Sequence, residues 1–101
     1  MARREARRRS QGPDARRHAM EVISQALAGR GYAHDILETS LSARRFSDAD
    51  RRLVSELVFG VIRRVATLDA VVGAFAARPL GEIDPAVRQA LRLGAYQLLF
   101  M

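Results

Sequence analysis

The segment from Ser47 to Val65 constrains the fold most, because its apolar residues recur at the period of an α-helix. These apolar positions share one side of a helix and are Leu53, Val54, Leu57, Val58, Val61, Ile62 and Val65. The stripe predicts an amphipathic helix with a buried apolar side. Ser47, with Asp50 three residues later, predicts the helix start. Gly60 costs about 1 kcal/mol relative to Ala in a helix, so we expect a packing reason for it, such as the close approach of another backbone.

Two helices are predicted before this central segment. The first opens at Gly12-Pro13-Asp14 and stops at Gly29-Arg30-Gly31, because Pro favours the first turn of a helix and Gly favours its end. Its inward residues are expected to be Ala19, Val22, Ile23, Ala26 and Leu27. The second covers about His34 to Ala43, and its inward residues are Ile36, Leu37 and Leu41.

Two more helices are predicted after the central segment. Ala66 and Thr67 are expected to form a bend, with Thr67 as the N-cap of a fourth helix. The apolar positions of that helix are Leu68, Val71, Val72 and Phe75. Residues 77–83 contain Pro and Gly and predict a loop. Asp84 as an acidic N-cap and Pro85 at the first helical position predict the start of the last helix.

The last helix is apolar nearly all round. Its main stripe is expected to be Val87, Ala90, Leu91, Gly94, Ala95, Leu98 and Leu99. Leu93, Tyr96 and Phe100 widen this surface, and we expect Tyr96 to lie in the core. Such a helix needs cover from more than one side. Because no polar residue, Gly or Pro follows Leu98, we also expect further helices beyond Met101.

Positive charge is concentrated near the N-terminus. The 17 basic residues are all arginines, and the formal net charge is +6. Residues 1–17 contain seven of these arginines and two acidic residues, so they carry most of that charge. We expect residues 1–12 to form a disordered basic arm and residues 13–101 to form one folded domain. The arm serves either as a loose nucleic-acid contact or as a solubilising tail.

Several classes of function lack the residues they need. The chain has no cysteine, no secretory signal and no apolar run of membrane length, so we expect a cytoplasmic protein without disulfides. His18 and His34 are too isolated for a metal site. Gly29-Arg30-Gly31 follows a helix, so it does not predict a cofactor loop. Glu56 is expected to be a surface carboxylate paired with an arginine, although a buried acid is the other interpretation.

Five segments, in this order, carry a resemblance to a known family. They are ARRHAMEVI (15–23), ELVFGVIRR (56–64), TLDAVV (67–72), RPL (78–80) and LRLGAYQLLFM (91–101). Over residues 14–101 the chain resembles the NusB-like N-terminal domain of the bacterial 16S rRNA cytosine-C5 methyltransferases (Sun/Fmu, RsmB type). The antitermination factor NusB shares this fold and the Leu-Asp pair, but ELVFGVIRR and Gln97 are more similar to the methyltransferase branch.

The resemblance implies an all-α fold of two small helical bundles. The first three helices form one bundle and the rest form the other, which is incomplete at its C-terminal end because the family continues with further helices. A linker and a catalytic domain that binds S-adenosylmethionine then follow in that family. Methylation of C5 of cytosine takes a cysteine nucleophile there. The chain has no cysteine, so it is not expected to be an enzyme alone, and the cofactor is expected for the full-length protein and not for this chain.

The implied function is to bind 16S rRNA and to position it for methylation. In this family the start of the first helix contacts RNA. Arg16 and Arg17 lie at the matching positions of this chain, so the resemblance implies that they contact RNA. Cations there oppose the helix dipole, and either an external anion or simple solvation explains them. Tyr32 is a candidate for stacking an RNA base, or else a loop aromatic that caps the core. The full set of candidate RNA-binding residues is Arg16, Arg17, His18, Tyr32, Arg63, Arg64 and Arg92, and a solvated surface explains the last three equally well.

Three alternatives remain from the sequence. The chain is a free-standing NusB-like antitermination factor, or it is a docking module that binds its own C-terminal catalytic domain or a ribosomal protein. A homodimer formed through the last helix is the third. No membrane partner is expected.

Overall fold

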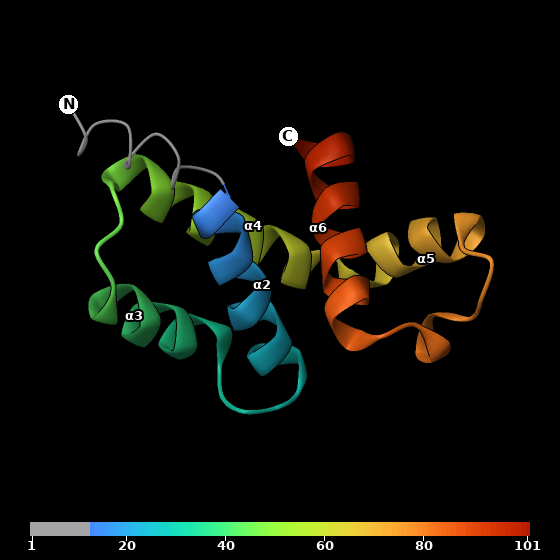
Figure 1. Ribbon diagram of the computed structural model, residues 1–101, viewed down its shortest axis with the longest axis horizontal. Helices are drawn as coiled ribbons and strands as arrows, with labels where there is room; N and C mark the ends of the chain where they lie inside the picture. Colours follow the sequence, from blue (N-terminus) through green and yellow to red (C-terminus); the bar gives the residue numbers. More distant parts are fainter. Residues whose placement is uncertain (1–12) are drawn as a thin grey trace.

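Five α-helices and one short 3-10 helix make up residues 13–101, the part of the chain that the computed structural model describes (Figure 1). The helices are α2 (Pro13–Leu27), α3 (Ala33–Ala43), α4 (Asp48–Arg63), α5 (Val65–Phe75) and α6 (Pro85–Phe100), and the 3-10 helix is η1 (Leu80–Glu82). These residues contain no strand, so the all-α class is confirmed. The predicted arm, residues 1–12, lies outside the described residues. None of the described helices is long and apolar enough to cross a membrane.

The predicted helix ends are confirmed where a local cap defines them. The Ser47 hydroxyl accepts a hydrogen bond from the Asp50 backbone N–H at 3.1 Å, and the Asp84 carboxylate accepts one from the Ala86 N–H at 2.9 Å. At the end of α2, Gly29 has a φ of +76°, which favours glycine. The Arg30 N–H donates to the Gln25 carbonyl at 3.1 Å, as in a Schellman motif.

The predicted bend at Ala66 and Thr67 is wrong. Helix α4 ends at Arg63 and α5 begins at Val65, so a single residue separates them. Arg64 adopts a φ of −113° and a ψ of 18°, and its backbone N–H bonds back to the Gly60 and Val61 carbonyls. The apolar period therefore runs on through the junction, which is why Val65 matched the stripe of the central helix.

Helices α2, α3 and α4, the first bundle, contribute most of a single buried core, which Leu68 of α5 and Leu93 and Tyr96 of α6 continue. The buried apolar residues of the first bundle are Ala15, Ala19, Val22, Ile23, Leu37, Leu41, Val54, Leu57, Val58 and Val61. This set confirms most of the predicted inward positions of all three helices. Leu27, at the end of α2, is exposed instead.

Helix α6 packs against α2, α4 and α5. It buries Tyr96, as predicted, but it does not bury the side that was expected to be its main stripe. Its buried residues are Gln89, Leu93 and Tyr96. The large apolar residues of α6 that are exposed are Val87, Leu91, Leu98, Leu99 and Phe100, most of them from the predicted main stripe. A helix that is apolar nearly all round does not specify which side it buries. Phe75 of α5, predicted to point inward, is likewise 88% exposed.

The crossing of α4 and α6 explains Gly60. A Cβ atom at Gly60 would overlap the Tyr96 ring, so only glycine lets that ring lie against α4. The Tyr96 hydroxyl donates to Glu56 Oε1 at 2.8 Å. The expected close approach is therefore confirmed, but it is made by a buried aromatic side chain and not by a backbone. Glu56 is exposed and accepts from a tyrosine, where an arginine partner was expected.

Candidate nucleic-acid interface

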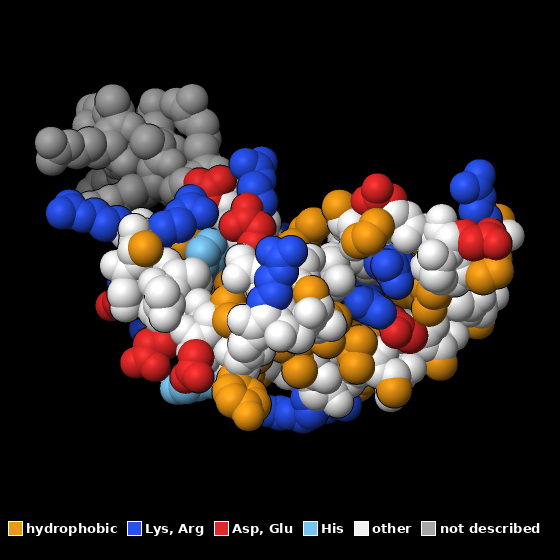
Figure 2. All heavy atoms as spheres, turned by 90° about the horizontal axis from the view of Figure 1, so that it is seen from below, with side chains coloured by type: hydrophobic (Ala, Val, Ile, Leu, Met, Phe, Trp, Pro, Cys, Tyr) orange, Lys and Arg blue, Asp and Glu red, His pale blue; other side chains and the backbone are white. Residues whose placement is uncertain are grey.

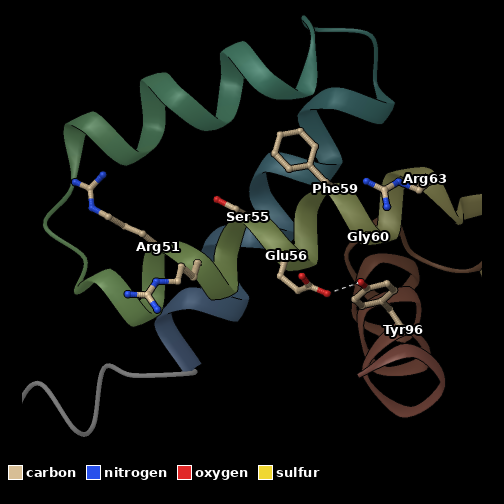
Figure 3. A pocket seen from close by; sticks show the side chains of 8 residues that line it. Arg51, Ser55, Glu56, Phe59, Gly60, Arg63 and Tyr96 are labelled. Carbon is tan, nitrogen blue, oxygen red and sulfur yellow. Dashed lines mark hydrogen bonds between the residues drawn. The ribbon is translucent and has the colours of Figure 1, made fainter.

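A groove of about 600 Å³ runs along the exposed side of α4 (Figure 3). We call it the α4 groove, and it is lined by Arg51, Arg52, Ser55, Glu56, Phe59, Gly60, Arg63 and Tyr96. Seven of these residues recur every three or four positions along α4, so they share the side opposite the buried stripe. Tyr96 comes from α6 and closes one end of the groove.

Three arginines and one glutamate give the α4 groove a positive balance. The Arg51 guanidinium donates to the Leu41 carbonyl at the end of α3, with a distance of 3.3 Å. Arg52 and Arg63 are exposed and stand near opposite ends of the groove. At 1.5 Å per residue they are about 16 Å apart along the helix axis. This separation suits an elongated anion better than a single phosphate.

The middle of the α4 groove combines an aromatic ring with a carboxylate. Phe59 is half-buried and faces the His34 ring of α3, with ring centroids 6.3 Å apart. Across the groove, Glu56 accepts the hydrogen bond from Tyr96 (Figure 3). Burial, and then the bond to Glu56, raise the pKa of the Tyr96 hydroxyl. Tyr96 therefore keeps its proton and holds one carboxylate oxygen of Glu56 in place.

Arg16 and Arg17, the predicted pair on the first helix, occupy the exposed side of α2. Arg16 Nε donates to Gln97 Oε1 at 2.7 Å, and Gln97 in turn donates to the Leu93 carbonyl at 3.2 Å. Gln97 directly follows Tyr96, so the same end of α6 contacts both Arg16 and the α4 groove. Arg17 lines a separate groove of about 300 Å³ between α2 and α6.

His18 does not occupy its predicted surface position. Its exposed fraction is 4%, and its ring lies 5.1 Å from that of Phe46, centroid to centroid. His18 Nε2 hydrogen bonds to the Ser40 hydroxyl at 2.8 Å. Burial, and then the nearby Arg44 guanidinium, lower the pKa of His18, whereas Glu21 acts in the opposite direction. His18 therefore joins α2 to α3 beneath the surface.

Tyr32 is far from the arginine pair. It lies in the loop after α2, at the other end of that helix from Arg16 (Figure 1). Its exposed fraction of 82% rules out the interpretation that it caps the core. Tyr32 lines a shallow groove of about 440 Å³ together with Arg30 and Thr39. The structure thus separates two features that were expected to act together.

The three remaining candidates differ in what they contact. Arg63 lines the α4 groove, and the Arg64 guanidinium stacks 3.9 Å from the centroid of the Phe100 ring. Arg92 makes a two-pronged ion pair with Asp69 of α5, with N–O distances of 2.6 and 2.8 Å. The Arg92 side chain is 11% exposed, so its guanidinium joins α5 to α6.

Sequence reasoning did not select Arg51, Arg52 or Phe59 for the site. The sequence does contain a signal for this site. Positions 52, 56, 59 and 63 are spaced so that they lie together on the polar side of a helix whose other side is apolar. An aromatic residue on that polar side marks a surface available for contact. The prediction followed the concentration of arginines near the N-terminus and therefore did not include these positions.

The arginines on the face drawn in Figure 2 do not form one continuous patch. They stand in separate groups, with apolar and acidic side chains between them. Residues 13–101 contain no group of three His, Asp or Glu side chains placed to bind a metal ion. Among the arginines, those that line the α4 groove form one local group.

Known proteins with similar sequences fall into two groups. The model of the NusB family matches residues 13–101. A protein of Mycobacterium tuberculosis named as a methyltransferase is 42% identical over 97 residues, covering 90% of this chain and 21% of that protein. A protein of Synechocystis named as ribosomal RNA small subunit methyltransferase B is 33% identical over 87 residues, covering 86% of this chain and 20% of that protein.

The second group carries the name transcription antitermination protein NusB. The protein of Halorhodospira halophila is 37% identical over 94 residues, covering 93% of this chain and 58% of that protein. The chain thus spans about a fifth of the length of the methyltransferase relatives and more than half of this NusB relative. No solved structure matches the chain.

Proposed function

Because the chain belongs to the NusB family, we propose that it binds single-stranded 16S rRNA and positions it for a cytosine-C5 methyltransferase of which it forms part. The observation that carries this proposal is the α4 groove, with exposed arginines toward both ends and an aromatic ring between them. The methyltransferase names of the Mycobacterium and Synechocystis relatives support the enzyme. The resemblance of ELVFGVIRR and Gln97 to the methyltransferase branch of the family supports the same assignment.

The composition of the α4 groove suits a single RNA strand. Guanidinium groups bind phosphate oxygens in pairs, so Arg52 and Arg63 would hold the backbone at two separate points. Proteins read RNA sequence mainly where bases are unstacked and can lie against aromatic side chains. Phe59 would offer such a surface. Arg16, held by Gln97 next to Tyr96, would extend the phosphate contacts onto α2.

The methyl-transfer chemistry is assigned to the full-length protein. S-adenosylmethionine would supply the methyl group there, and a cysteine would supply the nucleophile. Residues 13–101 do not fit this cofactor, because they contain no strand followed by a glycine-rich loop. Their role in the reaction is to bind and orient the RNA.

A second candidate function, protein docking, is favoured by the exposed apolar side of α6. Leu98 and Leu99 lie there with Val87 and Leu91, uncovered by other described residues. Exposed apolar surface of this kind marks contact sites. We propose that further helices of a longer protein cover it. The alternative to a methyltransferase domain is a free-standing antitermination factor. The name of the Halorhodospira relative, transcription antitermination protein NusB, supports this alternative.

The test is the affinity of the chain for a single-stranded 16S rRNA fragment, measured by fluorescence anisotropy over a range of salt concentrations. Replacing Arg52 and Arg63 by Glu should weaken binding at least tenfold. It should also reduce the slope of log affinity against log salt by about 1.4, because each phosphate contact on a single strand contributes about 0.7. The matched control replaces Arg45 and Arg78, two exposed arginines outside the α4 groove, by Glu.

The control variant has the same net charge, so it should keep most of the affinity. If both variants lost the same amount of RNA affinity, the α4 groove would have no specific role, and the change in net charge would explain the loss. If the unchanged chain does not bind RNA, the proposed function fails and the docking function takes its place.

A further inference from the structure

We propose that the α4 groove prefers RNA bases with an exocyclic amino group, cytosine, adenine or guanine, over uracil, and that Glu56 accepts the hydrogen bond from this group. The inference rests on the proposed RNA-binding function and adds base preference to it. It is based on Glu56, whose negative charge in the α4 groove is not explained by phosphate binding.

Glu56 is an exposed carboxylate in a groove with three arginines. If the groove bound only phosphates, this negative charge would lower its affinity for them, because like charges repel. A carboxylate accepts hydrogen bonds and cannot donate them. It therefore suits a ligand that carries anionic groups along its backbone and hydrogen-bond donors elsewhere. An RNA strand with amino-bearing bases has both.

One hydrogen bond, from Tyr96, restrains the Glu56 carboxylate. The Tyr96 hydroxyl donates a hydrogen bond to Oε1 of Glu56 at 2.8 Å, and the Tyr96 ring packs against Gly60. Oε2 takes no part in that bond, so it remains able to accept from a ligand. A carboxylate held in this way loses little freedom on binding, which favours a directional contact. Cytosine N4 is a donor that Glu and Asp side chains recognise, whereas uracil offers a carbonyl oxygen at the same position.

Phe59 provides the second contact that a base needs. It lines the α3 side of the α4 groove, and Glu56 lines the α6 side (Figure 3). A base that lies across the groove would meet the Phe59 ring with one face or edge and Glu56 with its amino group. Stacking on an aromatic ring tolerates any base, so the choice between bases would come from Glu56.

An acidic peptide is the other class of elongated anion that arginines attract. Its side-chain carboxylates would meet Glu56 in the middle of the α4 groove and be repelled. Its charged groups also carry no donor for Oε2. The carboxylate among the arginines therefore favours RNA over such a peptide.

The experiment compares the binding of the complete chain to labelled ten-nucleotide oligocytidylate and oligouridylate at one salt concentration. The unchanged chain should bind oligocytidylate at least about fivefold more tightly, as expected for one directional bond to a charged acceptor. Glu56→Gln keeps an oxygen for Tyr96 and places an amide donor beside it. The preference should then fall to less than twofold, while binding to oligouridylate stays the same or becomes tighter.

The matched control is Glu82→Gln, which makes the same change on η1, outside the α4 groove. It should keep the preference of the unchanged chain. Thermal unfolding would establish that Glu56→Gln is folded. Tyr96→Phe is a second variant that keeps the ring against Gly60 and removes the hydroxyl, and it should also reduce the preference.

The outcomes separate this inference from the proposed function. Equal binding of both oligonucleotides by the unchanged chain, or an undiminished preference in Glu56→Gln, would overturn the inference and leave RNA binding intact. Binding of a decaglutamate peptide as tightly as oligocytidylate would also overturn it. Loss of binding to both oligonucleotides in the unchanged chain would instead refute the proposed function.

Discussion

The two ends of the described chain differ in how completely they bury their apolar residues. Helices α2, α3 and α4 enclose a continuous core in which Ile23, Leu57 and Val58 have no exposed surface. Helices α5 and α6 contain residues of similar size, but Phe75 and Leu98 point to solvent. The first three helices cover one another, whereas α6 is covered on one side.

This difference relates stability to function. The buried stripe of α4 packs mainly against α2, and α3 and α6 add further contacts that hold α4 in place. Helix α6 adds Tyr96 to the exposed side of α4 and Gln97 to Arg16, so it completes the candidate interface. The more weakly covered element therefore shapes the site, and the well-packed bundle supports it.

The largest predicted effect tests the difference in packing directly. Leu57→Ala should lower the free energy of unfolding by about 2 to 5 kcal/mol, because it leaves a cavity in the first bundle. Leu98→Ala, the same change at a residue that is 87% exposed, should alter it by less than about 0.5 kcal/mol. Urea unfolding followed by circular dichroism would measure both. A similar loss in the two variants would show that α6 is as well buried as the first bundle.

A smaller effect is predicted where the two parts meet. Gly60→Ala should destabilise the protein by about 1 to 3 kcal/mol, because the new methyl group overlaps the Tyr96 ring. Gly94→Ala in α6 is the matched control, since a Cβ atom there meets nothing within 4 Å. It should stabilise the protein by about 0.5 to 1 kcal/mol through helix propensity. The melting temperatures of both variants would test the crossing. A neutral Gly60→Ala variant would argue against close packing of α6 on α4.

The smallest effect concerns pH and the first bundle alone. The pKa of His18 is lowered from its ordinary value of 6.5, so the folded state favours the neutral ring. The unfolded state binds a proton first as the pH falls, and stability is therefore lost below about pH 6.5. His18→Gln removes this titration, so it should show a smaller loss than the unchanged protein between about pH 7.5 and pH 5. Urea unfolding at both values would measure this, and equal losses would assign the pH dependence to other groups.

The sequence by itself determined where the helices lie and much of the first core. Ser47, Asp84 and Gly29 mark helix ends through bonds to residues no more than three positions away or through their own backbone angles. The apolar period of α4 predicted its buried side for the same reason, because a helix places residues on one side by local geometry. The family resemblance was also readable from short segments, and the match over residues 13–101 confirms it.

Only the tertiary structure decided which side of α6 is buried and which arginines have partners. Arg92 bonds to Asp69 and Arg16 to Gln97, across separations of 23 and 81 positions. Such pairs depend on how helices cross, and the apolar surface all round α6 permits several crossings. Gly60 and Tyr96 select one of them by shape, since the ring fits against α4 only where a side chain is absent. That fit places Tyr96 at one end of the α4 groove, so the candidate site joins one side of α4 to a residue 40 positions away from Glu56.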